Sequence, residues 1–157
     1  MRGYLLIIFI ILSSCKTTSN QVFNDQKKLI ISLEKTACFG TCPILKIEIY
    51  NNGTIVYNGI KHVKKIGLYN LEIEKQEIQK ILSKAEEIGF YKLKKEYTER
   101  ISDLPTTYIM INGKLIKDYF GAPKKLKDLE NQIEKKILDL LEPVSYTHLT
   151  LPTILLV

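Results

Sequence analysis

The fold is decided by residues 36–57, which read TACFGTCP (36–43), ILKIEIY (44–50) and NNGTIVY (51–57). Apolar and polar residues alternate along the middle part, and a period of two indicates a strand. Asn52-Gly53 is the preferred pair for a two-residue type I′ turn, so we expect a hairpin here. That turn would set Ile49 opposite Val56 and Tyr50 opposite Ile55.

Further strands are predicted on both sides of this hairpin. Residues 29–34 alternate in the same way, and another strand is expected from Lys65 to Ile73 after a turn near Gly59. A second Asn-Gly pair, Asn112-Gly113, predicts a hairpin between residues 106–111 and 114–120, with Ile109 facing Ile116.

Two helices are predicted from apolar residues at helical spacing. The first begins at Glu74 and ends at Gly89, and the second opens at Pro123, because proline is favoured in a first helical turn. We therefore expect an α+β domain, with an antiparallel sheet of about six strands and two amphipathic helices packed on one face. The order along the chain is four strands, a helix, two strands and a helix. The apolar stripes consist of Ile78, Ile81, Leu82, Ala85 and Ile88 in the first helix, and Leu126, Leu129, Ile133, Ile137, Leu140 and Leu141 in the second.

The first fifteen residues have the order of a secretory signal: a positive start, the apolar run Leu5 to Leu12, and small residues before Cys15. This run is too short to cross a bilayer, which needs about 20 residues. Leu12-Ser13-Ser14-Cys15 resembles the lipobox of bacterial lipoproteins, whose cysteine is lipidated and becomes the mature amino terminus. The alternative is an ordinary signal peptide with an incidental cysteine. The next residue is Lys16, whereas an Asp at this position would signal retention in the inner membrane. We therefore expect the protein to be anchored in the outer membrane, on its periplasmic side.

The domain organisation follows from these segments. We expect a signal peptide at 1–14, a lipidated flexible tether at 15–28 and a single domain at 29–142, because the polar tether cannot bury enough surface to order itself. Residues 143–157 are predicted to be a non-native tail. They carry no charge in a chain that is 25% charged, and they resemble translated sequencing-adapter read-through.

Cys38 and Cys42 form the main candidate for site chemistry. In an oxidising compartment nearby cysteines normally pair, and Gly40 permits the bend that brings their Cα atoms to about 5.5 Å. A disulfide closing so short a ring would contribute only about 2 kcal/mol. A redox pair is the alternative, although its usual form is Cys-x-x-Cys at a helix start. A metal site lacks ligands, because Cys15 is expected to carry lipid and His148 lies in the predicted tail, which leaves only His62 beside the two thiols.

The motif Cys38-Phe39-Gly40-Thr41-Cys42-Pro43, the strand after it and Asn52-Gly53-Thr54 resemble a family of small exported bacterial proteins, the domain-of-unknown-function family numbered 6438. Asp103-Leu104-Pro105-Thr106 and Phe120-Gly121-Ala122-Pro123 resemble later landmarks of that family. The resemblance covers residues 29–141. It implies a membrane-anchored or periplasmic domain and implies no activity.

A binding cleft is the second site hypothesis. The loop at Asp103-Leu104-Pro105 would meet the cysteine loop at one end of the sheet, and aromatic side chains would supply the binding surface. The candidate cleft residues are Phe39, Gly40, Thr41, Tyr91, Tyr97, Asp103, Pro105 and Tyr108. The alternative is that Asp103 only stabilises a turn before Leu104-Pro105, its carboxylate accepting hydrogen bonds from backbone N–H groups.

Enzymatic and nucleic-acid functions have little support in the sequence. Glu96, Glu99 and Asp103 could supply a hydrolytic carboxylate pair, but nothing in the sequence brings two of them together, and a solvated loop explains them as well. No cofactor motif is present. The net charge of +6 comes from lysines interleaved with glutamates, a pattern of solvated surfaces, so no nucleic-acid partner is expected. We expect a non-enzymatic envelope lipoprotein, held in the membrane by its lipid, that binds an envelope protein or a small ligand. The alternative is a thiol-dependent redox protein that uses Cys38 and Cys42.

Overall fold

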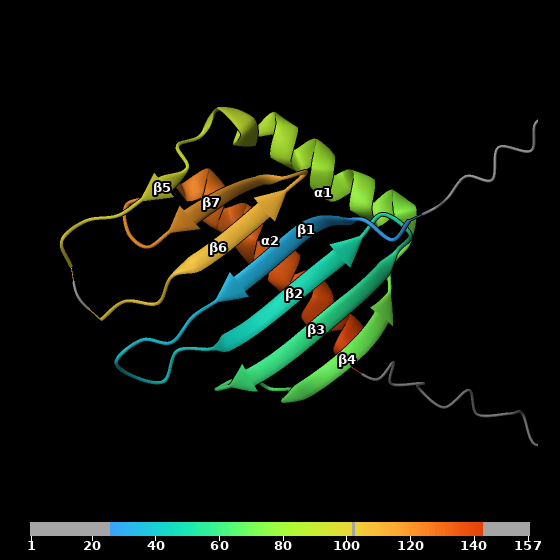
Figure 1. Cartoon of the computed structure of the whole chain (residues 1–157), viewed down its shortest axis with the longest axis horizontal. Coiled ribbons are helices and arrows are strands. Elements are labelled where there is room, and N and C mark those ends of the chain that lie inside the picture. The colour runs from blue at the N-terminus through green and yellow to red at the C-terminus, as the bar shows by residue number, and fades with distance from the viewer. Residues whose placement is uncertain (1–25, 102, 143–157) are drawn as a thin grey trace, which may run out of the picture.

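The computed structural model describes residues 26–101 and 103–142. The predicted signal peptide, Cys15, most of the tether and the tail at 143–157 lie outside these residues. The elements run in the order β1 (Leu29–Lys35), β2 (Ile44–Tyr50), β3 (Thr54–Lys61), β4 (Gly67–Glu72), α1 (Lys75–Glu87), the short 3₁₀ helix η1 (Phe90–Lys92), β5 (Glu96–Tyr97), β6 (Thr107–Ile111), β7 (Lys114–Asp118) and α2 (Lys124–Leu141) (Figure 1).

The strands form one mixed seven-stranded sheet in the order β4-β3-β2-β1-β6-β7-β5. The α+β class and the two helices are as predicted, but the expectation of a purely antiparallel sheet of about six strands is wrong. β5 adds a seventh strand, which pairs parallel to β7. Its backbone contacts include a 2.9 Å hydrogen bond from Tyr119 N to Tyr97 O. A two-residue strand in a charged segment has no alternation from which it can be predicted.

The register of the first hairpin differs from the prediction by one residue. Ile49 pairs with Ile55, not with Val56, because the connection contains Asn51 as well as Asn52-Gly53. Gly53 donates its N–H to Tyr50 O at 3.0 Å. A one-residue slip moves a whole strand to the other face of a sheet. The observed register places Ile55 on the buried face beside Ile49, whereas the predicted one would expose it.

The second hairpin has the predicted register, with Ile109 opposite Ile116. Asn112 and Gly113 both have positive φ, 47° and 83°, as a type I′ turn requires. The turn expected near Gly59 lies instead at residues 62–66, and Gly59 belongs to β3. A Cβ on Gly59 would lie 1.9 Å from Lys65 O, so glycine is needed there because another part of the backbone comes close.

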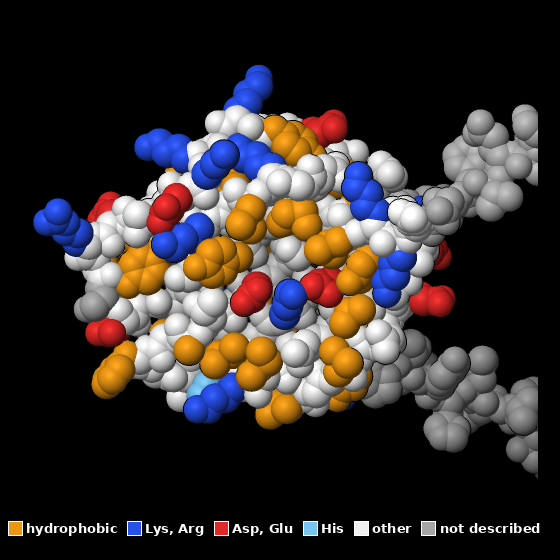
Figure 2. Space-filling view, in the orientation of Figure 1, with side chains coloured by type: hydrophobic (Ala, Val, Ile, Leu, Met, Phe, Trp, Pro, Cys, Tyr) orange, Lys and Arg blue, Asp and Glu red, His pale blue; other side chains and the backbone are white. Residues whose placement is uncertain are grey.

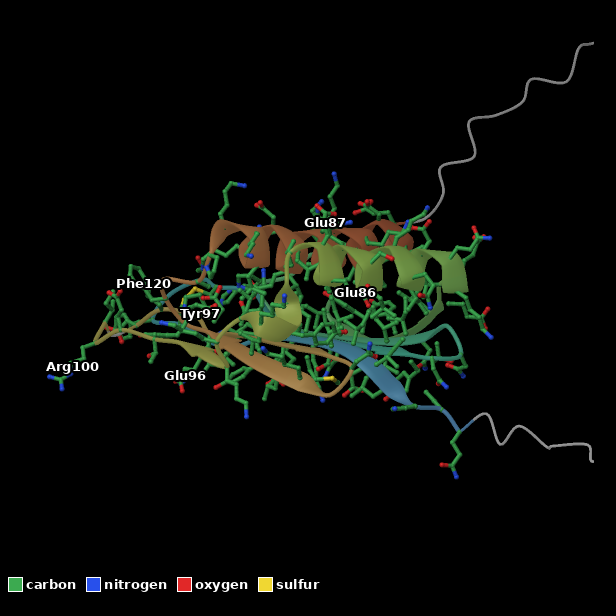
Figure 3. All side chains as sticks on the ribbon, turned by 90° about the horizontal axis from the view of Figure 1, so that it is seen from above. Glu86, Glu87, Glu96, Tyr97, Arg100 and Phe120 are labelled. Carbon is green, nitrogen blue, oxygen red and sulfur yellow. A yellow bond between two sulfur atoms is a disulfide. The ribbon has the colours of Figure 1, made fainter. Side chains whose placement is uncertain are left out.

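Both helices cover the same face of the sheet, as predicted. Figure 3 shows them edge-on as one layer above the strands. An ion pair of 2.6 Å between Lys136 Nζ and Glu77 Oε2 links α2 to α1. The core between the layers contains β1, β2, β3, β6 and β7 side chains together with the helix stripes. Its largest fully buried side chains include Tyr57, Phe90, Ile31, Leu33, Leu45, Ile47, Ile49, Ile55, Ile109, Ile111, Ile116 and Leu126.

Among residues 26–101 and 103–142, no helix covers the other face of the sheet. Figure 2 looks onto this face and shows apolar side chains spread among charged ones. Leu68 is 67% exposed, and Lys46 forms a 2.6 Å ion pair with Glu48. Among the described residues, no helix is both long enough and apolar enough to cross a membrane.

Candidate functional site

Three loops meet at one end of the sheet, the end at which β1 and β7 finish and β2 and β6 begin (Figure 1). They are the β1–β2 loop with the two cysteines, the β5–β6 loop and the β7–α2 loop. Thr36 and Thr106 join the first two, since Thr36 N donates to Thr106 O at 3.0 Å and Thr106 N donates to Thr36 Oγ1 at 3.1 Å. Tyr119 joins the other two, because its hydroxyl donates to Ile101 O.

A pocket of about 320 Å³ opens at this end between the sheet and the start of α2. The strands contribute Lys35, Thr107 and Asp118, and α2 contributes its amino-terminal half. The loops form the rim, on which Phe120 is partly exposed. The complete lining is Lys35, Leu104, Pro105, Thr107, Asp118, Tyr119, Phe120, Lys127, Glu130 and Asn131. Figure 3 shows Phe120 and Tyr97 at this end, with Arg100 beyond them at the tip of the β5–β6 loop.

The pocket contains two buried acids, Asp118 and Glu130, which are only 3% and 4% exposed. Their place in the elements explains their burial. Asp118 follows Ile116 by two residues in β7, so it lies on the same inward face. Glu130 lies four residues after Leu126 and three before Ile133, which places it within the apolar stripe of α2. Buried acids are normally paired, because an isolated charge in a low-dielectric interior is costly.

Only part of this acidity is compensated. Lys127 Nζ donates to Asp118 Oδ2 at 2.9 Å, whereas Lys35 is paired with Glu134. Within the described residues, Asp118 Oδ1 and Glu130 Oε1 are buried and have no hydrogen-bond partner, and no ion pair includes Glu130. An oxygen left in this way costs about 1–3 kcal/mol, so the two residues are unfavourable for the fold alone.

The surroundings also change the titration of Glu130. Burial raises its pKa to about 7, and the nearby carboxylates of Asp118 and Glu134 raise it as well, while Lys127 and Lys35 oppose the rise. Glu130 therefore changes between its neutral and ionised forms near neutral pH. A carboxyl of this kind can donate a hydrogen bond when neutral, and when ionised it only accepts hydrogen bonds, on both oxygens.

The cysteine loop lies beside the pocket and does not line it. Cys38 and Cys42 are joined by a disulfide, with Cα atoms 5.8 Å apart. The loop connects two strands, so neither sulfur stands at a helix start, where a redox cysteine would gain acidity. Phe39 is 90% exposed at its tip, and Gly40 and Thr41 are exposed beside it.

The other residues of the predicted cleft are dispersed. Pro105 lines the pocket. Asp103 precedes Pro105 by two residues; it is exposed and has a φ of 73°. Tyr97 lies in the edge strand β5. Tyr91 is at the opposite end of the sheet, where its hydroxyl accepts a 3.1 Å hydrogen bond from Asn112 Nδ2 in the β6–β7 turn. Tyr108 alternates with the buried Ile109 in β6, so it faces the uncovered side of the sheet.

Of the residues proposed for hydrolysis or metal binding, Glu96 and His62 lie apart from the pocket, whereas Glu99 Oε1 would lie 3.6 Å from a Cβ on Gly121, next to Phe120 at the rim. Glu96 forms a 2.7 Å ion pair with Lys117 at the sheet edge. His62 is exposed in the β3–β4 turn. Within residues 26–101 and 103–142, no three His, Cys, Asp or Glu side chains are grouped as a metal site would require.

The sequence reasoning missed both buried acids, although each has a signal. Glu130 occupies a stripe position between Leu129 and Ile133, and Asp118 continues the alternation of β7 inward. Both positions follow from the same periodicities that predicted the elements.

The comparisons with known proteins agree with this fold unit. The family described as "Domain of unknown function (DUF6438)" matches residues 29–137, from the first residue of β1 to the last buried residue of α2. The chain belongs to this family. The match spans the pocket and the cysteine loop together, so both are parts of the DUF6438 domain. No curated protein and no solved structure shows detectable similarity to the chain.

Proposed function

We propose that this DUF6438 protein is a lipid-anchored, non-enzymatic binding module of the bacterial envelope, and that its ligand occupies the pocket formed by β7, α2 and the β5–β6 loop. The observation that carries the proposal is the pair Asp118 and Glu130. Both are buried, both line an open pocket, and each has an oxygen without a partner among the described residues. A bound molecule that donates hydrogen bonds would offset the cost of these oxygens.

The size and composition of the pocket support a small polar ligand. A volume of about 320 Å³ lies at the lower end of the range for small-molecule sites, roughly 300–1,000 Å³. Phe120 and Tyr119 provide apolar surface at the rim, while Asn131 and Thr107 add groups that both donate and accept. Such a lining fixes the orientation of a ligand through a few polar contacts.

Binding is tested by screening a library of small cationic, anionic and neutral polar compounds against the purified chain, with amide NMR shifts as the readout. We expect hits whose shifts cluster at Leu104, Tyr119 and Phe120. The variant Asn131→Trp, which replaces an exposed pocket residue with a bulky one, should abolish them. Gln132→Trp is the matched control, because Gln132 is exposed on the same helix and outside this pocket. A library without hits at these residues, or hits that persist in Asn131→Trp, would overturn the proposal.

The anchor is tested separately at Cys15, which lies outside the described residues. We expect Cys15→Ala to lose the lipid, so that the protein expressed in a bacterium moves from the detergent phase to the aqueous phase. The mass of the wild-type protein should show a lipidated amino-terminal cysteine. If the variant is cut at the same bond and stays with the membrane, the lipoprotein assignment is wrong.

A further inference from the structure

We propose that the group recognised in this pocket is a cation, a primary ammonium or a guanidinium, bound between the carboxylates of Asp118 and Glu130. This inference rests on the proposed binding function and assigns its ligand class. It starts from the charges that reach the pocket and from the partners that each of them already has.

The positive charges of the lining are already engaged. Lys127 donates to Asp118 Oδ2, and Lys35 is paired with Glu134 on α2. Glu130 has no ion pair among the described residues, and Asp118 keeps one oxygen without a partner. With Glu130 ionised, the buried part of the pocket has one negative charge more than its lysines balance. A cationic ligand supplies that charge, which an anion or a neutral molecule does not.

Hydrogen-bonding capacity leads to the same ligand class. Ionised carboxylates only accept hydrogen bonds, and an ammonium or guanidinium only donates them. A carboxylate side chain also has a soft terminal torsion, so Asp118 and Glu130 can turn an oxygen toward a bound group without moving the backbone. Phe120 stands partly exposed at the rim, where an aromatic ring adds attraction for a cation.

Proton competition gives the proposal a distinctive readout. The groups that act on Glu130 are Asp118 on β7, Lys35 on β1, and Lys127 and Glu134 on α2, and burial with the two acids holds its pKa at about 7. A cation binds the ionised form, so the proton on Glu130 must leave first. Between pH 6 and pH 8 the ionised fraction of such a group rises about tenfold, and the affinity for a cation should rise by about the same factor.

The test uses probes that share one carbon chain and differ in the head group: n-butylammonium, n-butylguanidinium, butan-1-ol and butyrate. Each is titrated into the purified chain at pH 6 and pH 8 while the amide shifts of Tyr119 and Phe120 are followed. We expect the two cations to bind about tenfold more tightly at pH 8. Glu130→Gln should weaken cation binding at least tenfold at pH 8 and remove its pH dependence. Asp128→Asn is the control, because it removes an exposed carboxylate of the same helix, and it should behave as the wild type does.

The outcomes separate this inference from the proposed function. If butan-1-ol or butyrate binds as tightly as the cations, or if Glu130→Gln binds cations like the wild type, the cation assignment is overturned and the pocket remains a ligand site. If library compounds bind but neither cationic probe shifts the pocket amides, the assignment is also overturned. If neither the library nor any probe shifts them, the binding function fails with it.

Discussion

Replacing Glu130 with Gln should raise the free energy of unfolding by about 3 kcal/mol at pH 8 and flatten its pH dependence between about pH 4.5 and pH 7. The wild-type pKa is about 7 in the folded state, against 4.5 for an ordinary glutamate. Burial is the main cause, followed by the charge of Asp118. A difference of about 2.5 pKa units corresponds to about 3 kcal/mol.

The sign follows from which state binds the proton. Between pH 4.5 and pH 7 the folded protein keeps a proton on Glu130 that the unfolded chain has released. The folded state is therefore increasingly disfavoured as the pH rises through this window, and the penalty is complete above pH 7. Glutamine has the same shape and no charge, so it removes the penalty. The other groups facing residue 130, namely Asp118, Lys35, Lys127 and Glu134, remain in place.

The measurement is urea unfolding of the wild type and the variant at several pH values from 5 to 8. Asp128→Asn is the control and should keep the wild-type pH dependence. The titration of Glu77 does not affect this comparison. Lys136 and then Lys80 lower the pKa of Glu77 to about 2, so its contribution to folding stability is fully present above pH 4.5 in both proteins. A Glu130→Gln variant that is less stable than the wild type at pH 8 would show that the ionised carboxylate is satisfied in the fold.

Replacing Gly59 with Ala should destabilise the domain by about 3 kcal/mol or more, although alanine usually stabilises an ordinary strand position relative to glycine. The added Cβ would lie 1.9 Å from Lys65 O and 2.8 Å from the Tyr57 hydroxyl. Tyr57 donates a hydrogen bond of 3.1 Å to that same Lys65 carbonyl. One methyl group would thus displace the backbone after β3 and break a hydrogen bond of a fully buried tyrosine.

Chemical unfolding of the purified chain measures this effect, with Gly40→Ala as the control. A Cβ on Gly40 would meet only Cys38 Sγ at 3.7 Å, an ordinary contact, so this variant should change stability by less than about 1 kcal/mol. Tyr57→Phe in the Gly59→Ala background should not restore stability, because the contact with Lys65 O remains. Equal stabilities of the two alanine variants would contradict the close approach at Gly59.

The sequence predicted the fold where local chemistry and burial agree. At Asn112-Gly113 both turn residues adopt positive φ, and the two-residue turn places Ile109 and Ile116 together on the buried face. At Asn52-Gly53 the two-residue turn that the local sequence favours would expose Ile55. The observed register instead buries Ile55 opposite Ile49. β5 was missed because its contacts are tertiary: Glu96 and Tyr97 are ordered by the edge of β7, which lies some twenty residues later in the chain.

The site was less predictable than the fold. The residues whose chemistry is recognisable in the sequence, such as Cys38, Cys42 and Asp103, lie in loops. The acids that line the pocket lie inside regular elements, where Glu130 reads as one more polar residue of a charged helix. That the two acids lie near each other depends on how α2 packs against the end of β7, which no local sequence pattern encodes. The burial of each acid was readable from periodicity, but their proximity was not.

The first described residues lie at the end of the sheet opposite to the pocket, so an anchor upstream of them would hold the domain by its far end. Lys28 is held there by Asn51 in the β2–β3 turn, to which it donates a 2.8 Å hydrogen bond. A lipid on Cys15 would pull on that end, and the roughly eleven residues from Cys15 to Gln26 can reach at most about 38 Å. The pocket mouth would then point away from the bilayer, toward the aqueous space. Molecules dissolved there, or fixed in a layer above the membrane, would meet the site first.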